Sequence, residues 1–155
     1  MTADARQPLT DYFRVLLLTV VGQAFAAAGY HLEERPAQWA GGLFRFTADL
    51  GGGARGSIAF QLLAYTDTEW SSGSASRFTV ILSRRTPPGA ALPSAERALS
   101  RLVVDDFGVA ILPSADHWWS FSGTEQLGRA LAEAGHLIVG YGLPWLAGDL
   151  VPPSG

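Results

Sequence analysis

The sequence predicts a single α+β domain, in which an antiparallel sheet of about five strands is packed by a long N-terminal and a long C-terminal helix. Three observations predict this fold. Apolar residues recur with helical spacing near both ends of the chain, residues between them alternate with the period of strands, and no repeat or linker interrupts the 155 residues. A hydrophobic content of 48% with 16% charged residues is typical of a globular chain. We expect one domain over residues 1–155, with an ordered core at about 9–147 and a loose tail at 148–155.

The first helix is predicted to run from Leu9, after a first-turn Pro8, to a stop at Gly29. Its apolar stripe consists of Tyr12, Phe13, Leu16, Val20, Ala24 and Ala27. Leu18 and Phe25 lie on the opposite side, so this helix must be covered on two sides. We expect the second contact within the chain, with a homodimer as the alternative to a monomer. Because this second apolar side can also meet another protein, Leu18 and Phe25 are candidate binding-surface residues.

The same segment, "FRVLLLTVVGQAFAAAGY", has the apolar run and small residues that end a signal peptide. Asp4 and Asp11 offset Arg6 and Arg14, so the positive start of a signal peptide is missing. The apolar run is also shorter than the roughly 20 residues of a membrane span. We expect a helix in a cytoplasmic protein, with a cleaved signal peptide as the alternative.

Three strands are predicted at 43–48, 58–63 and 77–85, where large apolar residues alternate with small or polar ones. The glycines of "GGGARG" match a dinucleotide-binding pattern by letter, but no helix follows them, and a hairpin is the better interpretation. Further along, 94–102 is predicted as a short helix capped by Ser94, and 107–121 as a fourth strand, a turn and a fifth strand.

The C-terminal helix is predicted to begin with a capping box at Ser122 to Glu125, in which the hydroxyl and the carboxylate each bond a free amide. Its apolar stripe consists of Leu127, Leu131, Ala134, Ile138 and Tyr141. Glycines and Pro144 end it, and Trp145 is expected to dock before the tail.

One group of acids and an imidazole has the residue types of a metal or acid–base site: Asp105, Asp106, Asp116 and His117. These residues are split between two segments, where aspartates commonly cap the backbone. We keep them as candidate catalytic residues without assigning a catalytic or metal site. The chain has no cysteine, so no thiolate ligand or thiol nucleophile exists, and no cofactor is expected.

The stretch "ADHWWSF" places two tryptophans next to each other. On a strand they must point to opposite faces, because the side-chain period is two. We expect Trp119, with Phe121, to face the core and Trp118 to face outward, where a half-exposed tryptophan can anchor a partner. Trp70, in the polar loop before the third strand, is a further candidate for the binding surface.

Charge argues against a general nucleic-acid binder. The chain carries a net charge of −3, and its cations are all arginines. Several arginines cluster in sequence around the third strand and the segment after it: Arg77, Arg84, Arg85, Arg97 and Arg101. A solvated rim is the preferred interpretation, since Asp105 and Asp106 follow directly, and nucleic-acid binding through this rim is kept as an alternative.

The order of these elements, together with "AAAGY", "FRF", "IAFQL", "RFTVIL", "HWWSF" and "GLPWL", resembles the bacterial domain-of-unknown-function family 4304 (DUF4304). The resemblance covers about residues 10–147. It implies an α+β fold and no established activity. The chain departs from the family at Ile81, where an asparagine is common.

These observations predict a non-catalytic domain that binds an unknown protein partner, for example an accessory or immunity-type protein. The absence of a convergent catalytic set in the sequence favours this hypothesis over an enzyme. A small metal-assisted hydrolase that uses the Asp/His group is the first alternative, and nucleic-acid binding is the second.

Overall fold

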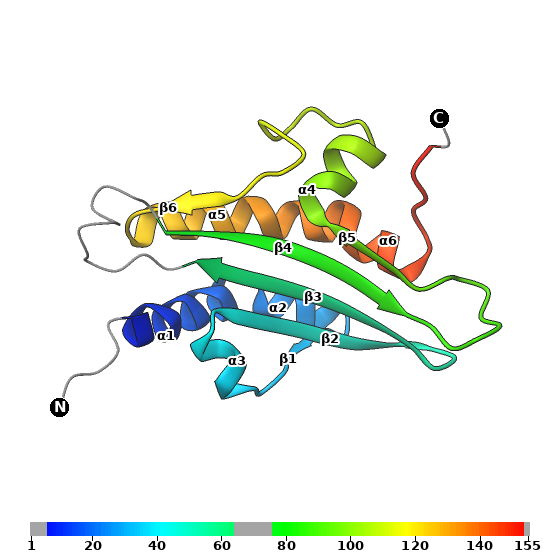
Figure 1. Ribbon diagram of the computed structural model, residues 1–155, viewed down its shortest axis with the longest axis horizontal. Helices are drawn as coiled ribbons and strands as arrows, with labels where there is room; N and C mark the ends of the chain where they lie inside the picture. Colours follow the sequence, from blue (N-terminus) through cyan, green and yellow to red (C-terminus); the bar gives the residue numbers. More distant parts are fainter. Residues whose placement is uncertain (1–5, 64–75, 154–155) are drawn as a thin grey trace.

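The computed structural model describes residues 6–63 and 76–153 and shows an α+β domain with one antiparallel sheet, as predicted (Figure 1). The sheet runs in the order β1-β2-β3-β4-β5, and β6 pairs with β4 beside β5. Its strands are β1 (His31–Leu32), β2 (Leu43–Gly51), β3 (Ala54–Leu63), β4 (Ser76–Arg85), β5 (Ala95–Ala98) and β6 (Trp119–Phe121). All three long strands match predicted ones.

Two long helical segments run on the same side of the sheet. The first is α1 (Arg6–Leu17), the π-helical turn η1 (Leu18–Gly22) and α2 (Gln23–Ala27). The second is α5 (Thr124–Leu137), η3 (Ile138–Gly142) and α6 (Leu143–Ala147). Shorter pieces are α3 (Pro36–Ala40), α4 (Leu99–Arg101) and η2 (Leu102–Asp106).

The core lies between these helices and the sheet. Phe13 of α1 packs against Phe44 and Phe78, with ring centroids 5.2 and 5.6 Å apart. Phe25 of α2 packs edge-on against Phe46 at 5.1 Å. The alternate residues of the same strands face away from the helices, which makes the sheet hydrophobic on one face and mixed on the other.

Phe25 is buried, so its predicted place on a binding surface is wrong, and the reason lies in the geometry of the first helical segment. Phe13, Leu17, Val21 and Phe25 are spaced by four and are all buried. The π turn η1 inserts the extra residue that keeps this four-residue spacing on one side, whereas a regular helix would rotate Phe25 outward. Leu18, at the start of η1, is 41% exposed, so the contact within the chain that we expected on its side of the helix does not cover it.

The segment Leu9–Ala27 is long and apolar enough to span a membrane by length and composition alone, which contradicts the expectation that its apolar run is too short. A core helix passes the same test, and here Phe13, Leu17 and Phe25 are fully buried against the sheet. The segment is therefore weak evidence for a membrane span.

The predicted helix at 94–102 was partly wrong. Residues Ala95–Ala98 form β5, which pairs with β4 from Arg84↔Ala95 to Ile81↔Ala98, and the helix starts only at Leu99. Pairing with the free edge of β4 overrides the local helical pattern. Ser94 caps no helix, and its Oγ accepts a hydrogen bond from the Thr86 amide at 2.9 Å.

The expected fourth strand at 107–112 is also wrong. Because β5 already occupies one part of β4, the chain must travel along the sheet before β6 can pair with Ser76–Phe78. Residues 107–118 form this connection, with Gly108 at φ 69° and Phe107 packed against Tyr141.

The expected capping box of α5 is wrong in detail. The helix begins at Thr124 after Gly123, whose φ of 118° suits glycine. Oε1 of Gln126 accepts a hydrogen bond from the Ser122 amide at 2.9 Å, in place of the expected carboxylate of Glu125. Glu125 instead accepts a hydrogen bond from Arg129 at 2.7 Å.

Candidate functional site

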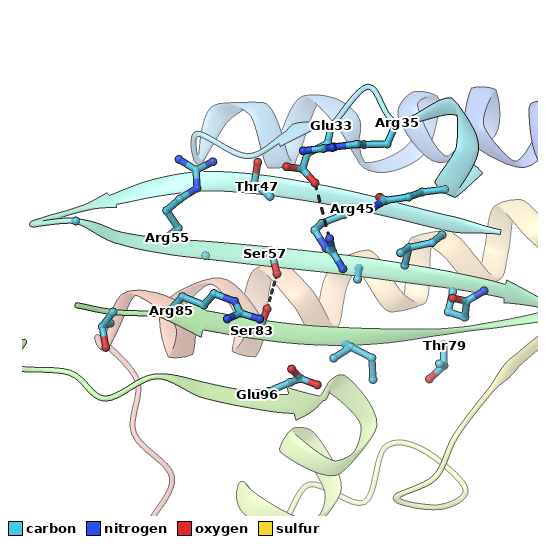
Figure 2. Close-up of a pocket in the computed structure, with 18 of the residues that line it drawn as sticks. Glu33, Arg35, Arg45, Thr47, Arg55, Ser57, Thr79, Ser83, Arg85 and Glu96 are labelled. Atoms are coloured by element: carbon cyan, nitrogen blue, oxygen red, sulfur yellow. Dashed lines mark hydrogen bonds and ion pairs between the residues drawn. The ribbon is translucent and has the colours of Figure 1, made fainter. Parts of the chain in front are cut away.

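The face of the sheet opposite the helices is hollowed, with a volume of about 900 Å³ (Figure 2). We call it the open face. It consists of the outward residues of β2, β3 and β4, together with Glu33, Arg35 and Gln38 from the segment before β2, Glu96 of β5 and Trp118. Figure 2 shows its side chains standing on the strands, with the helices behind the sheet.

The strand register arranges the open face in rows that cross the sheet. One row is apolar at its centre, where Ala59 is opposite Ile81 and Ile81 is opposite Ala98. The next row carries hydroxyls, with Thr47 opposite Ser57 and Ser57 opposite Ser83. The Ser57 and Ser83 hydroxyls are hydrogen-bonded to each other.

The last row carries charge. Arg55 of β3 is directly opposite Arg85 of β4, and both side chains are exposed. Figure 2 shows both arginines at the same end of the open face. Asp49, opposite Arg55 on β2, turns its Oδ1 to the Gly51 amide at 2.9 Å within the hairpin.

Cations outnumber anions on the open face, although the whole chain has a net charge of −3. Its lining contains four arginines (Arg35, Arg45, Arg55 and Arg85) and two glutamates (Glu33 and Glu96). Only Arg45 has an acidic partner among the residues that the structure describes, Glu33 at 4.0 Å. The open face is therefore a locally positive surface on an acidic protein.

Trp118 borders the open face, and Trp119 faces the core, as predicted. Trp119 is 4% exposed, stacks on Phe78 at 5.5 Å and donates from Nε1 to Glu133 at 2.8 Å. The guanidinium of Arg77 lies 4.8 Å from the ring centroid of Trp118. The binding role of Trp118 stays a prediction.

The acid and imidazole candidates do not form one site. Asp106 is held by two hydrogen bonds from Arg97, at 2.9 and 2.8 Å. Arg101 pairs with both Asp105 and Asp116. Among the described residues, no three His, Asp or Glu side chains are placed to hold a metal ion. Arg101 of α4 thus joins Asp105 to Asp116 in the segment before β6, and Arg97 of β5 holds Asp106, so each carboxylate serves as the ion-pair partner of an arginine.

His117 makes its described ring contact with Trp119, against which it packs edge-on at 4.7 Å. Burial lowers the pKa of His117 below its ordinary value, and the nearby charge of Glu133 opposes this shift. The Ser100 hydroxyl, which is 2% exposed, fixes the backbone here by donating to the Ala115 carbonyl at 2.7 Å. His117 therefore belongs to a packed structural junction.

The arginines of the predicted rim lie in different environments and do not form one surface. Arg84 is buried among backbone carbonyls, Arg97 and Arg101 are paired with acids, and Arg77 lies over Trp118. Only Arg85 contributes its charge to the open face without an acidic partner in the described chain. These arginines therefore do not form the continuous positive surface that nucleic-acid binding through the rim would need.

The other surface candidates lie elsewhere. Leu18 is exposed on the helical side of the molecule together with Tyr12 and Val15. Trp70 lies outside the described residues.

Arg45 of β2 and Arg55 of β3 are functional candidates that were not predicted from the sequence. The alternation that places Phe44 and Phe46 inside also places Arg45 outside, so this signal was present. The pairing of Arg55 with Arg85 depends on the register between two strands, which local patterns do not specify.

Comparison of the chain with models of protein families, with curated proteins and with solved structures finds no match. The resemblance to DUF4304 therefore stays a prediction.

Proposed function

We propose that this protein is a non-catalytic binding domain that recognises a protein partner on the open face of its sheet. The observation that carries the proposal is the gathering of arginines, hydroxyls and Trp118 on a hollow sheet face of about 900 Å³. By contrast, the candidate catalytic carboxylates form ion pairs with arginines away from this face; they are Asp105, Asp106 and Asp116.

The composition of the open face favours a protein over a small molecule. Small-molecule sites are mostly apolar and enclose the ligand with a few polar groups. Here the hollow extends over three long strands, and charged or hydroxyl side chains surround a small apolar centre at Ala59 and Ile81. Arginine and tryptophan are enriched among the residues that dominate binding energy at protein interfaces.

The proposal is tested by placing a photo-crosslinking amino acid at Thr79, on the open face, in protein expressed in its own host. A crosslinker at Glu125, which is 84% exposed on α5, is the matched control. We expect a defined crosslinked protein from Thr79 and none from Glu125. The product should disappear when Ile81→Arg fills the apolar centre, provided that circular dichroism shows an intact fold.

Failure of Thr79 to give a product, or the same product from Glu125, would contradict binding on the open face. The metal-assisted hydrolase and nucleic-acid alternatives have no supporting constellation in the described part of the chain and are not proposed.

A further inference from the structure

We propose that the open face recognises an extended acidic segment of its partner, with a carboxylate held between Arg55 and Arg85. This inference depends on the proposed function and adds the chemistry of the bound segment.

Like charges that lie directly opposite each other on adjacent strands are destabilising. Arg55 and Arg85 are such a pair, and neither forms an ion pair with any residue in the described ranges. Elsewhere in the described chain Arg97, Arg101 and Arg129 each have an acidic partner. Asp49 is opposite Arg55 on β2, but its Oδ1 accepts the Gly51 amide and it forms no ion pair with Arg55 in the described chain. A carboxylate from a ligand would supply an anionic partner and accept charge-assisted hydrogen bonds from both guanidinium groups.

The acids of the open face argue against a nucleic-acid ligand. Glu96 is opposite Ser83 on β5, one row from Arg85, and Glu33 lies beside Arg45. A phosphate backbone carries charge continuously and would be repelled by these groups and by the net charge of −3. A peptide can place a carboxylate at one row and neutral side chains at the next.

The rows also predict the spacing within such a peptide. Ala59 and Ile81 lie four residues along their strands from Arg55 and Arg85, which corresponds to about 13 Å. An extended peptide that lies along the strands has the same rise per residue. If its acidic residue and its apolar residue are four positions apart, the acid lies over Arg55 and Arg85 while the apolar side chain lies over Ala59 and Ile81. The hydroxyls of Ser57 and Ser83 lie between the two rows.

The test uses a fluorescein-labelled, threonine-rich peptide that carries a Glu-Thr-Glu stretch and a leucine four positions after the second glutamate. Fluorescence anisotropy measures its binding to the full chain at low salt. We expect binding that is at least about tenfold weaker for the peptide with glutamines in place of glutamates, since hydrogen bonds to charged groups are lost.

On the protein side, Arg55→Gln and Arg85→Gln should each weaken binding about tenfold. Arg129→Gln, on an exposed helix face, is the matched control and should leave binding unchanged. Equal binding of the glutamine peptide would overturn the acidic-segment proposal. So would equal weakening by Arg129→Gln, or tighter binding of an oligothymidylate than of the glutamate peptide.

The crosslinking experiment separates this proposal from the broader one. If the Thr79 product persists in the Arg55→Gln/Arg85→Gln double variant, the open face binds a partner without the acidic contact. If no Thr79 product forms even in the wild-type chain, the proposed function itself fails.

Discussion

The guanidinium group of Arg84 donates from Nη1 to the carbonyl oxygen of Trp145 at 2.8 Å and to that of Leu146 at 3.2 Å. Its Nε donates to the Pro93 carbonyl at 2.9 Å, and the group lies 5.3 Å from the centre of the Trp145 ring. Arg84 is only 6% exposed. A buried cation is thus satisfied by carbonyls near the end of a helix, where the backbone is partially negative. The contact ties α6 and the segment before β5 to the C-terminal end of β4.

Replacing Arg84 by methionine should lower the free energy of unfolding by about 2–3 kcal/mol, because one buried and two partly buried hydrogen bonds to backbone carbonyls lose their charged donor. Arg85→Met is the matched control, since the neighbouring arginine faces the open side and makes none of these bonds. Urea denaturation of both variants checks the prediction. Equal losses from the two substitutions would show that the bonds of Arg84 are not responsible.

The two adjacent tryptophans should differ in the same assay. Trp119→Ala removes a core side chain and its hydrogen bond to Glu133, and a loss of about 3–4 kcal/mol is expected. Trp118→Ala should cost about 1 kcal/mol, because its main described ring contact is the cation–π contact with Arg77. A larger loss at Trp118 than at Trp119 would reverse the assignment of faces.

Ionisation of Tyr30 should lower the free energy of unfolding at high pH. Tyr30 is 3% exposed, its hydroxyl has no hydrogen-bond partner in the described structure, and burial raises its pKa to about 12, with Arg84 acting in the opposite direction. Above pH 10 the unfolded chain loses this proton while the folded chain keeps it, so the free energy of unfolding falls as pH rises toward 12. The contribution of the protonated Tyr30 side chain to the free energy of unfolding is fully present below pH 10.

Tyr30→Phe isolates this effect, because the remaining tyrosines are common to both proteins. Between about pH 8 and about pH 11, wild type should lose about 1 kcal/mol more than the variant. Denaturant titrations at the two pH values measure the difference. Parallel losses in the two proteins would mean that Tyr30 ionises normally in the folded state.

Periodicity predicted the parts of the fold whose environment is local in sequence. The alternation in β2, β3 and β4 correctly separated core from outward residues, and the same argument placed Trp119 inside. The failures have non-local causes. β5 forms because β4 offers a free edge, and Phe25 is buried because a π turn shifts the phase of the helix.

The candidate site was less predictable than the fold. The sequence places Asp116 beside His117 but does not show that Arg101 holds the aspartate. Gly56 was assigned to the hairpin, whereas it lies within β3, where a Cβ would come within 2.3 Å of the Tyr30 hydroxyl. Arg55 and Arg85 are 30 positions apart by their numbers, and only the strand register brings them together. Contacts of this kind depend on the assembled sheet.

The pairing of Arg55 with Arg85 predicts that function and stability oppose each other on the open face. Removing one charge relieves repulsion between two exposed guanidinium groups, so Arg55→Gln should raise the free energy of unfolding by about 0.3 kcal/mol at low salt. High salt screens exposed charges, and the gain should disappear there. Arg129→Gln, which breaks an exposed pair with Glu125, should instead be neutral or slightly destabilising at low salt. Denaturation midpoints at low and high salt measure both variants. A loss of stability in Arg55→Gln would mean that this arginine supports the fold, and its position would then need no ligand to explain it.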